Sequence, residues 1–168
     1  YLRSGAIARF ANIMESVQEY AANGGKVLGI CNGFQILLEA GLLPGAMKRN
    51  DSLHFISKYH TLKVVNTDNT FLSLLNKDDV LNIPVAHHDG NYYIDADGLK
   101  ELENNNQILL KYCDKDGNLV NMNGSVSNIA GICNKEKNVF GLMPHPERAI
   151  EELLGSIDGV NMLKGFLQ

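Results

Sequence analysis

A cysteine between two glycines forms a pentapeptide that could hold a nucleophile. The segment Gly29-Ile30-Cys31-Asn32-Gly33 has the pattern G-x-nucleophile-x-G and follows a short apolar run. In a strand-to-helix turn of this kind the nucleophile adopts a strained backbone conformation, and we expect each glycine to avoid a collision with neighbouring backbone. At the start of a helix the macrodipole favours a thiolate at Cys31, and the backbone N–H of Asn32 would point at a developing oxyanion. The pentapeptide alone is also compatible with a small cysteine buried in a tight turn.

A histidine between two prolines could act as the base for this cysteine. His145 follows an apolar run and lies within Pro144-His145-Pro146-Glu147, so that the prolines restrict the backbone on both sides. The carboxylate of Glu147 could bond one imidazole nitrogen and leave the other to face a thiol. Alone, this motif could equally be a turn histidine beside an exposed glutamate. Together with the cysteine pentapeptide it predicts a Cys-His-Glu set for nucleophilic catalysis.

A second polar cluster offers a metal-binding alternative. The segment His87-His88-Asp89 could supply ligands, and His54 and His60 could join them. Adjacent histidines on a strand face opposite sides, so both could bind one ion only from a loop. We therefore predict no metal site. Cys113 and Cys133 have no acid or base beside them, and we expect both to be core or surface thiols.

Helices and strands alternate in the pattern that must position these residues. Apolar spacing predicts a helix over 6–22, a strand over 26–30 that is buried on both faces, and a helix over 34–40. Further strands are expected at 62–65, 84–86, 92–94, 107–112, 129–132 and 139–142, and further helices at 97–104 and 159–167. This order indicates an α/β fold in one domain over 1–168, with an antiparallel part added to the sheet.

The composition excludes several classes of protein. The chain has 168 residues and is 45% hydrophobic, which is enough for the core of one domain. Its 15 Lys+Arg and 19 Asp+Glu give a net charge of −4, without a basic stripe for nucleic acid. It has neither a signal peptide nor an apolar run of the roughly 18 residues that cross a bilayer, so we expect a soluble cytoplasmic protein. Three cysteines without a CxxC pair indicate free thiols.

The motifs resemble the class I, or triad, glutamine amidotransferases, and more narrowly the glutaminase subunits of phosphoribosylformylglycinamidine synthase. Three stretches in chain order carry the resemblance: 27–37, 39–46 and 141–149. Shorter stretches support it at 1–9, 49–53, 66–68, 123–125 and 129–132. The resemblance implies a flavodoxin-like fold, with a mostly parallel sheet flanked by helices.

The resemblance also implies a role for each residue of the set. Cys31 would attack the side-chain amide of glutamine, and the N–H of Asn32 would hold the oxyanion. His145, oriented by Glu147, would protonate the departing ammonia. It would then activate the water that hydrolyses the glutamyl thioester to glutamate.

The implied partners are glutamine and a synthetase subunit. Gly33 and Gln35, the latter one turn along the helix, are the expected glutamine contacts beyond the triad. The synthetase subunit would use the ammonia to convert formylglycinamide ribonucleotide to its amidine in purine biosynthesis, and a small third subunit can bridge the two. This chain has no Gly-rich phosphate-binding loop, so we expect it to carry no cofactor and the synthetase to bind ATP and Mg²⁺.

Two departures from the family limit the comparison. The family has His-Gly-Glu-Gly where this chain has His87-His88-Asp89-Gly90, and we expect that loop to lie off the triad and to affect docking or gating. The family also has a strand, helix pairs and a second oxyanion donor before residue 1. We therefore expect this chain alone to be poorly stable, and a glutaminase weakened by about 10²–10³ in rate.

Three alternative functions stay open on the sequence. A Cys-dependent γ-glutamyl peptidase, or an amidotransferase for another acceptor, would keep the same triad. A non-catalytic subunit of the same fold would have lost the reaction. A metal-dependent hydrolase would use the cluster at 87–89.

Overall fold

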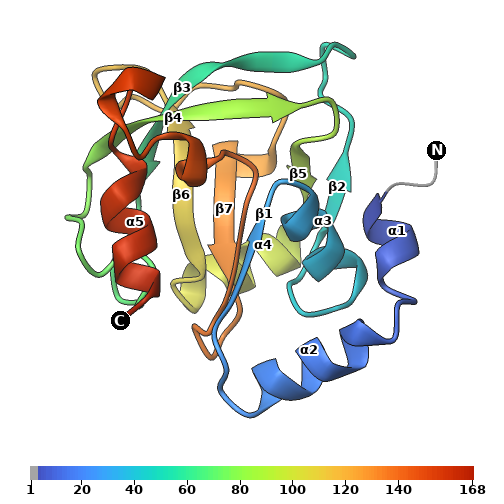
Figure 1. Cartoon of the computed structure of the whole chain (residues 1–168). Helices are drawn as coiled ribbons and strands as arrows, with labels where there is room; N and C mark the ends of the chain where they lie inside the picture. The colour runs from blue at the N-terminus through green and yellow to red at the C-terminus, as the bar shows by residue number, and fades with distance from the viewer. Residues whose placement is uncertain (1–3) are drawn as a thin grey trace.

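The computed structural model describes residues 4–168, so the part of the stretch 1–9 that falls on Tyr1–Arg3 lies outside it. The helices and strands follow in the order α1 (Ser4–Ala8), α2 (Ile13–Ala22), β1 (Val27–Ile30), α3 (Asn32–Glu39), β2 (Ala46–Lys48), β3 (Ile56–Val64), β4 (Val80–His87), β5 (Asn91–Tyr93), α4 (Ala96–Asn104), β6 (Ile108–Cys113), η1 (Val126–Asn128), β7 (Ile129–Cys133), β8 (Val139–Leu142), η2 (Pro146–Arg148), η3 (Glu152–Leu154) and α5 (Gly159–Phe166) (Figure 1).

The main sheet has six strands in the order β1-β8-β7-β6-β3-β4. The α/β class is confirmed, but the expected mostly parallel sheet is wrong for residues 4–168, where β1 and β8 form the one parallel pair. For β7 and β8 the physical reason is the length of the connection. Five residues, 134–138, join β7 to β8, and a parallel crossover needs a dozen or more.

The sheet curls so that its last two strands lie across the end where β1 stops. In Figure 1, β3 and β4 run across the top of the view while β1, β6 and β7 run vertically. The backbone N–H of His145, just after β8, donates to the carbonyl oxygen of Pro84 in β4 at 2.8 Å. The curl therefore brings the edge strand β4 to the carboxyl ends of β1 and β8.

Buried apolar side chains form one cluster on each side of the sheet. One cluster joins the sheet to α5, where Phe71, Phe140 and Phe166 contact one another. The other joins the sheet to α3 and α4 and includes Phe34, which stacks on Tyr92. α3 is thus fixed against the sheet by its own buried apolar face. No helix within residues 4–168 is both long and apolar enough to span a membrane.

The helix predicted over 6–22 is confirmed in part: it is divided into α1 and α2, because the chain turns between them. The backbone there tightens to i→i−3 hydrogen bonds, and Gly5 packs against the backbone of Gln35 in α3. Ile7 and Phe10, which the spacing placed on the buried face, are exposed.

Other elements were predicted in part. β3 and β4 extend well beyond 62–65 and 84–86, and Pro84 is tolerated in β4 because that strand lies at an edge of the six-stranded sheet. β2 was missed, and it pairs with β5 in a separate two-stranded sheet.

Candidate active site

Cys31 occupies the strained turn that the pentapeptide predicts. It lies between β1 and α3 with φ 53° and ψ −107°, a conformation that few non-glycine residues adopt. A Cβ at Gly29 would lie 2.7 Å from the backbone of Gly33, which confirms the expected collision. The same expectation is wrong for Gly33, where a Cβ would meet no atom of the described chain within 4 Å. Gly33 therefore leaves open space at the first turn of α3.

The thiol of Cys31 is partly buried and donates to the carbonyl oxygen of Ala86 at 3.8 Å. Burial raises its pKa above the ordinary value, although the N–H of Asn32 and the guanidinium of Arg148 both act to lower it. The resting group is thus a thiol. The sequence argument that the helix terminus favours a thiolate is outweighed by desolvation.

His145 lies at the same edge of the sheet as Cys31. β1 and β8 are parallel neighbours with Ile30 opposite Leu142, and the N–H of Cys31 donates to the Leu142 carbonyl oxygen at 2.8 Å. The charge of Glu147 reaches the thiol and raises its pKa. The structure therefore brings together the three residues that the sequence singled out.

The imidazole of His145 is buried and held by Glu147. Its Nδ1 lies 2.6 Å from Oε1 of the carboxylate, which accepts the proton and so leaves Nε2 as the reactive nitrogen. Nε2 is buried and makes no hydrogen bond to the described residues. This geometry supplies a base of fixed tautomer with one nitrogen available.

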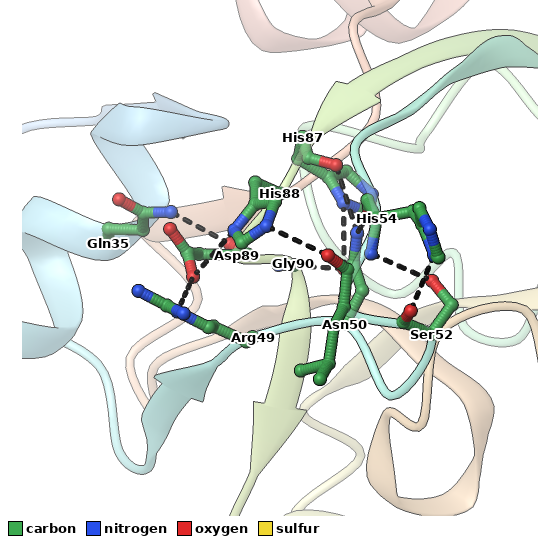
Figure 2. A network of polar contacts seen from close by, with 10 residues as sticks. Gln35, Arg49, Asn50, Ser52, His54, His87, His88, Asp89 and Gly90 are labelled. Carbon is green, nitrogen blue, oxygen red and sulfur yellow. Dashed lines mark hydrogen bonds and ion pairs between the residues drawn. The ribbon is translucent and has the colours of Figure 1, made fainter.

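The loop at 87–90 lies against the candidate nucleophile, so the expectation that it lies off the triad is wrong. Ala86, whose carbonyl oxygen accepts the hydrogen bond from the Cys31 thiol, directly precedes this loop. The Gln35 side chain, from α3, donates through Nε2 to the Asp89 carbonyl oxygen at 2.8 Å (Figure 2). The sequence could not show this because the contact depends on the curl of the sheet.

A buried asparagine, missed by the sequence analysis, fixes this loop. Asn50 is fully buried, donates through Nδ2 to the carbonyl oxygens of His54 and His87, and accepts through Oδ1 from the Gly90 N–H (Figure 2). Its Oδ1 also lies 3.1 Å from Nδ1 of His87. An asparagine in a polar loop gives no local signal of such a role.

His87 is a buried neutral histidine beside the site. It is 3% exposed and ends the inward-facing row of β4 that includes Ile83 and Val85. Burial, and after it the charge of a protonated His145, lowers its pKa to about 4. Because Oδ1 of Asn50 accepts a hydrogen bond from Nδ1 of His87, the proton of the neutral imidazole is on Nδ1.

Gln35, expected to contact glutamine, is already bonded to the loop that contains Asp89. The Gln35 side chain is buried, and its amide nitrogen is engaged by the backbone of Asp89. The Asp89 carboxylate lies 3.9 Å from Nε of Arg49 and 3.5 Å from Nδ1 of His88 (Figure 2). Gln35 therefore also joins α3 to the loop.

The cluster proposed as a metal alternative does not converge. His87 points to Asn50. His88 instead lies beside Asp89, and its Nε2 is within hydrogen-bond distance of the Leu53 carbonyl oxygen. Within residues 4–168, no three His, Cys, Asp or Glu side chains are grouped to hold a metal ion.

The other two cysteines lie in the core of the protein. Cys113 and Cys133 are both fully buried. Burial raises the pKa of Cys113 and raises that of Cys133 to about 12. Of the two alternatives that the sequence left open, core or surface thiols, the structure shows that both are core thiols.

Comparison with known proteins agrees with this site. Residues 4–161 match the family described as the CobB/CobQ-like glutamine amidotransferase domain. The chain is 70% identical over 168 residues to the phosphoribosylformylglycinamidine synthase subunit PurQ of Sulfurimonas denitrificans, covering all of this chain and 75% of that protein. It is 64% identical to PurQ of Wolinella succinogenes, covering 99% of this chain and 74% of that protein.

A solved structure has the same fold. A chain in the structure of PurLQS from Thermotoga maritima matches with a TM-score of 0.87 at 41% identity, covering 99% of this chain and 72% of that one. The likeness includes the class I glutamine amidotransferase fold expected above. The chain belongs to the CobB/CobQ-like glutamine amidotransferase family, among the relatives of the PurQ subunit of phosphoribosylformylglycinamidine synthase.

Proposed function

We propose that Cys31, His145 and Glu147 hydrolyse glutamine in this chain, as the glutaminase subunit of phosphoribosylformylglycinamidine synthase in purine biosynthesis. One observation carries the proposal. A cysteine in a strained strand-to-helix turn lies at the same sheet edge as a buried histidine whose Nδ1 is 2.6 Å from a carboxylate. This is the arrangement that covalent acyl transfer requires.

The reaction begins with proton transfer, because the resting thiol is protonated. His145 Nε2 takes the proton of Cys31, and the sulfur attacks the side-chain carbonyl carbon of glutamine. The N–H of Asn32 donates to the oxyanion of the tetrahedral intermediate. The imidazolium, stabilised by Glu147, returns its proton to the leaving nitrogen, and ammonia departs.

The second half of the reaction regenerates the thiol. Nε2 of His145 removes a proton from water, whose oxygen attacks the glutamyl thioester. The sulfur leaves and regains a proton from the imidazolium, and glutamate is released. Gly33 supports substrate binding by leaving open space at the first turn of α3, and Gln35 by holding the loop at Asp89.

We also propose that the ammonia is used on another subunit. A synthetase subunit, which binds ATP and Mg²⁺, receives the ammonia, and a small subunit can bridge the two. The relatives are named as subunits of a synthase, which supports a partner of this kind. The chain binds glutamine but neither nucleic acid nor membrane, and a cytoplasmic location suits its free thiols.

Covalent labelling tests the proposal directly. The chain is incubated with 6-diazo-5-oxo-norleucine, a glutamine-shaped electrophile, and adducts are located by intact mass and peptide mapping. We expect one adduct on Cys31, prevented by excess glutamine, and none on Cys113 or Cys133, which are buried. His145→Ala should lose the adduct, and His54→Ala, at an exposed histidine, should keep it.

Other labelling patterns would contradict the proposal. Equal labelling of the three cysteines would show reactivity without a glutamine site. Absence of any adduct would favour the non-catalytic subunit. An adduct that forms without protection by glutamine would favour a cysteine hydrolase for another substrate.

A further inference from the structure

An exposed apolar loop directly follows the catalytic histidine and glutamate. Its large apolar residues are all substantially exposed: Leu153 by 93%, Ile157 by 50%, Leu154 by 48% and Ile150 by 40%. A monomeric surface rarely presents so many large apolar side chains together unless they contact something. We call these four residues the docking patch.

The loop that carries the docking patch has a defined conformation. Glu151 and Ser156 form an antiparallel bridge, which places Ile150 and Ile157 opposite each other at the base and Leu153 and Leu154 at the tip. The N–H of Gly159 donates to the Ala149 carbonyl oxygen at 2.9 Å and closes the loop.

Contacts to β3 and β4 hold the loop on the curled part of the sheet. The Asp158 carboxylate accepts from the N–H of Asn82 at 2.7 Å. The hydroxyl of Tyr59 donates to the Leu154 carbonyl oxygen. The patch is therefore a preformed surface, which lowers the entropic cost of binding a partner.

The patch lies at the end of the molecule where the reaction takes place. η2, which contains Glu147, precedes Ile150 by one buried residue, Ala149. Figure 1 shows the segment between β8 and α5 at the same upper end as the start of α3, whereas α5 leads away to the C-terminus.

The apolar surface continues beyond the loop along β3. Tyr59 in β3 is 38% exposed, and Phe55, which directly precedes that strand, is 60% exposed. Tyr59 in turn contacts Leu154. An extended surface of this kind suits a protein partner better than a small ligand.

The occupant follows from the product of the reaction. Ammonia released to neutral water is mostly protonated and is then no nucleophile. The subunit that consumes it must therefore cover the end of the sheet where Cys31 lies. A partner seated there reaches the docking patch, since the patch adjoins η2.

The charges around the patch define the chemistry of this partner. Exposed Glu147, Glu151 and Glu152 outnumber Arg148 within the same segment. Resting on the function proposed above, we infer that the docking patch binds the synthetase subunit, through an apolar socket rimmed by basic side chains on that subunit.

Binding measurements with charged variants test the inference. The probe is the set of other subunits of the Sulfurimonas denitrificans synthase, purified together. Leu153→Asp should weaken binding about 30-fold, as expected when a buried interface anchor is lost. Ile157→Asp should weaken it as well. Leu167→Asp is the matched control, because Leu167 is 81% exposed but lies beyond the far end of α5, and its affinity should stay within about twofold of wild type.

The outcomes separate this inference from the proposed function. Leu153→Asp should keep its labelling at Cys31 while the complex releases ammonia instead of using it. Wild-type affinity in both patch variants, or an equal loss in Leu167→Asp, would overturn the inference. A photo-crosslinker at position 153 should react with the synthetase subunit, and reaction with a second copy of this chain or with a bridging subunit would overturn it. If Cys31 is not labelled but Leu153→Asp still loses the partner, the proposed function fails and the docking surface remains.

Discussion

The buried histidine at the end of β4 should make the stability of the fold depend on pH. His87 has its pKa lowered from 6.5 to about 4, first by burial and then by the charge of His145, while Asp89 acts in the opposite direction. Between these two values the unfolded chain binds a proton at His87 and the folded chain does not. Stability therefore rises with pH in this window, is complete above about 6.5, and is lost as the pH falls through about 4.

The size of the effect follows from the two pKa values. Each pKa unit corresponds to about 1.4 kcal/mol, so the difference between 6.5 and about 4 is worth about 3 kcal/mol of unfolding free energy. The local slope should approach about 1.4 kcal/mol per pH unit near the middle of the window. His60, whose pKa is also lowered by burial, adds a slope of the same sign. A comparison of variants is therefore needed to isolate His87.

Urea unfolding followed by circular dichroism measures this slope. The free energy of unfolding is determined for the wild type and for His87→Leu at several pH values between about 4.5 and 7.5. This range includes the pH at which an ordinary histidine titrates. Leucine suits the position because Ile83 and Val85 precede it on the same buried face of β4. His87→Leu should give a flatter dependence on pH, and His87→Gln should flatten it equally.

The control is a histidine on the surface. His54→Gln, at an exposed position, should retain the wild-type dependence. Parallel curves for the wild type and His87→Leu would refute the reasoning, because they would show that His87 binds its proton alike in both states.

Three further predictions concern the elbow and its neighbours. Gly29→Ala should lower the free energy of unfolding by about 1–3 kcal/mol because its methyl group would overlap the backbone of Gly33, whereas Gly33→Ala should keep the wild-type Tm and raise the KM for glutamine. Equal melting curves for the two variants would contradict this. Glu147→Gln keeps the side-chain shape but removes the charge, so kcat should fall by up to about 10⁴-fold at unchanged Tm; an unaltered kcat would exclude an orienting role. Arg148→Met removes a cation that lowers the pKa of Cys31, so alkylation by iodoacetamide should require a higher pH than in the wild type, and superimposable profiles would count against this interaction.

The elbow and the His145–Glu147 pair could be predicted because their geometry is local. Gly29 gives the turn at Cys31 the room it needs, and two prolines with a carboxylate two residues on restrict and orient the histidine. The helix over α1 and α2 could not be predicted in this way. Its apolar spacing is regular, yet packing of Gly5 on α3 redirects the chain and leaves Phe10 exposed.

The part of the site formed by β4 depends on contacts far apart in the chain. Ala86 reaches the thiol of Cys31 only because β3 and β4 curl over the sheet, and Asn50 holds the following loop from 37 residues away. Sequence spacing carries no information about either contact. The same limit explains why the cluster at 87–89 was read as a possible metal site, since the burial of His87 was not apparent.

The geometry of β4 also bears on how the proposed reaction obtains its charge. The resting thiol of Cys31 has a raised pKa and donates to a carbonyl oxygen, so it does not store a thiolate. His87 is held neutral beside His145, with its proton directed to Asn50, and does not compete for the proton of the thiol. Nε2 of His145 is buried, unbonded to the described residues and oriented by Glu147 through the opposite nitrogen. In the mechanism proposed above, the charge that attacks glutamine therefore comes from proton transfer from Cys31 to His145 during the reaction, and burial of the thiol strengthens the dependence of the rate on that transfer.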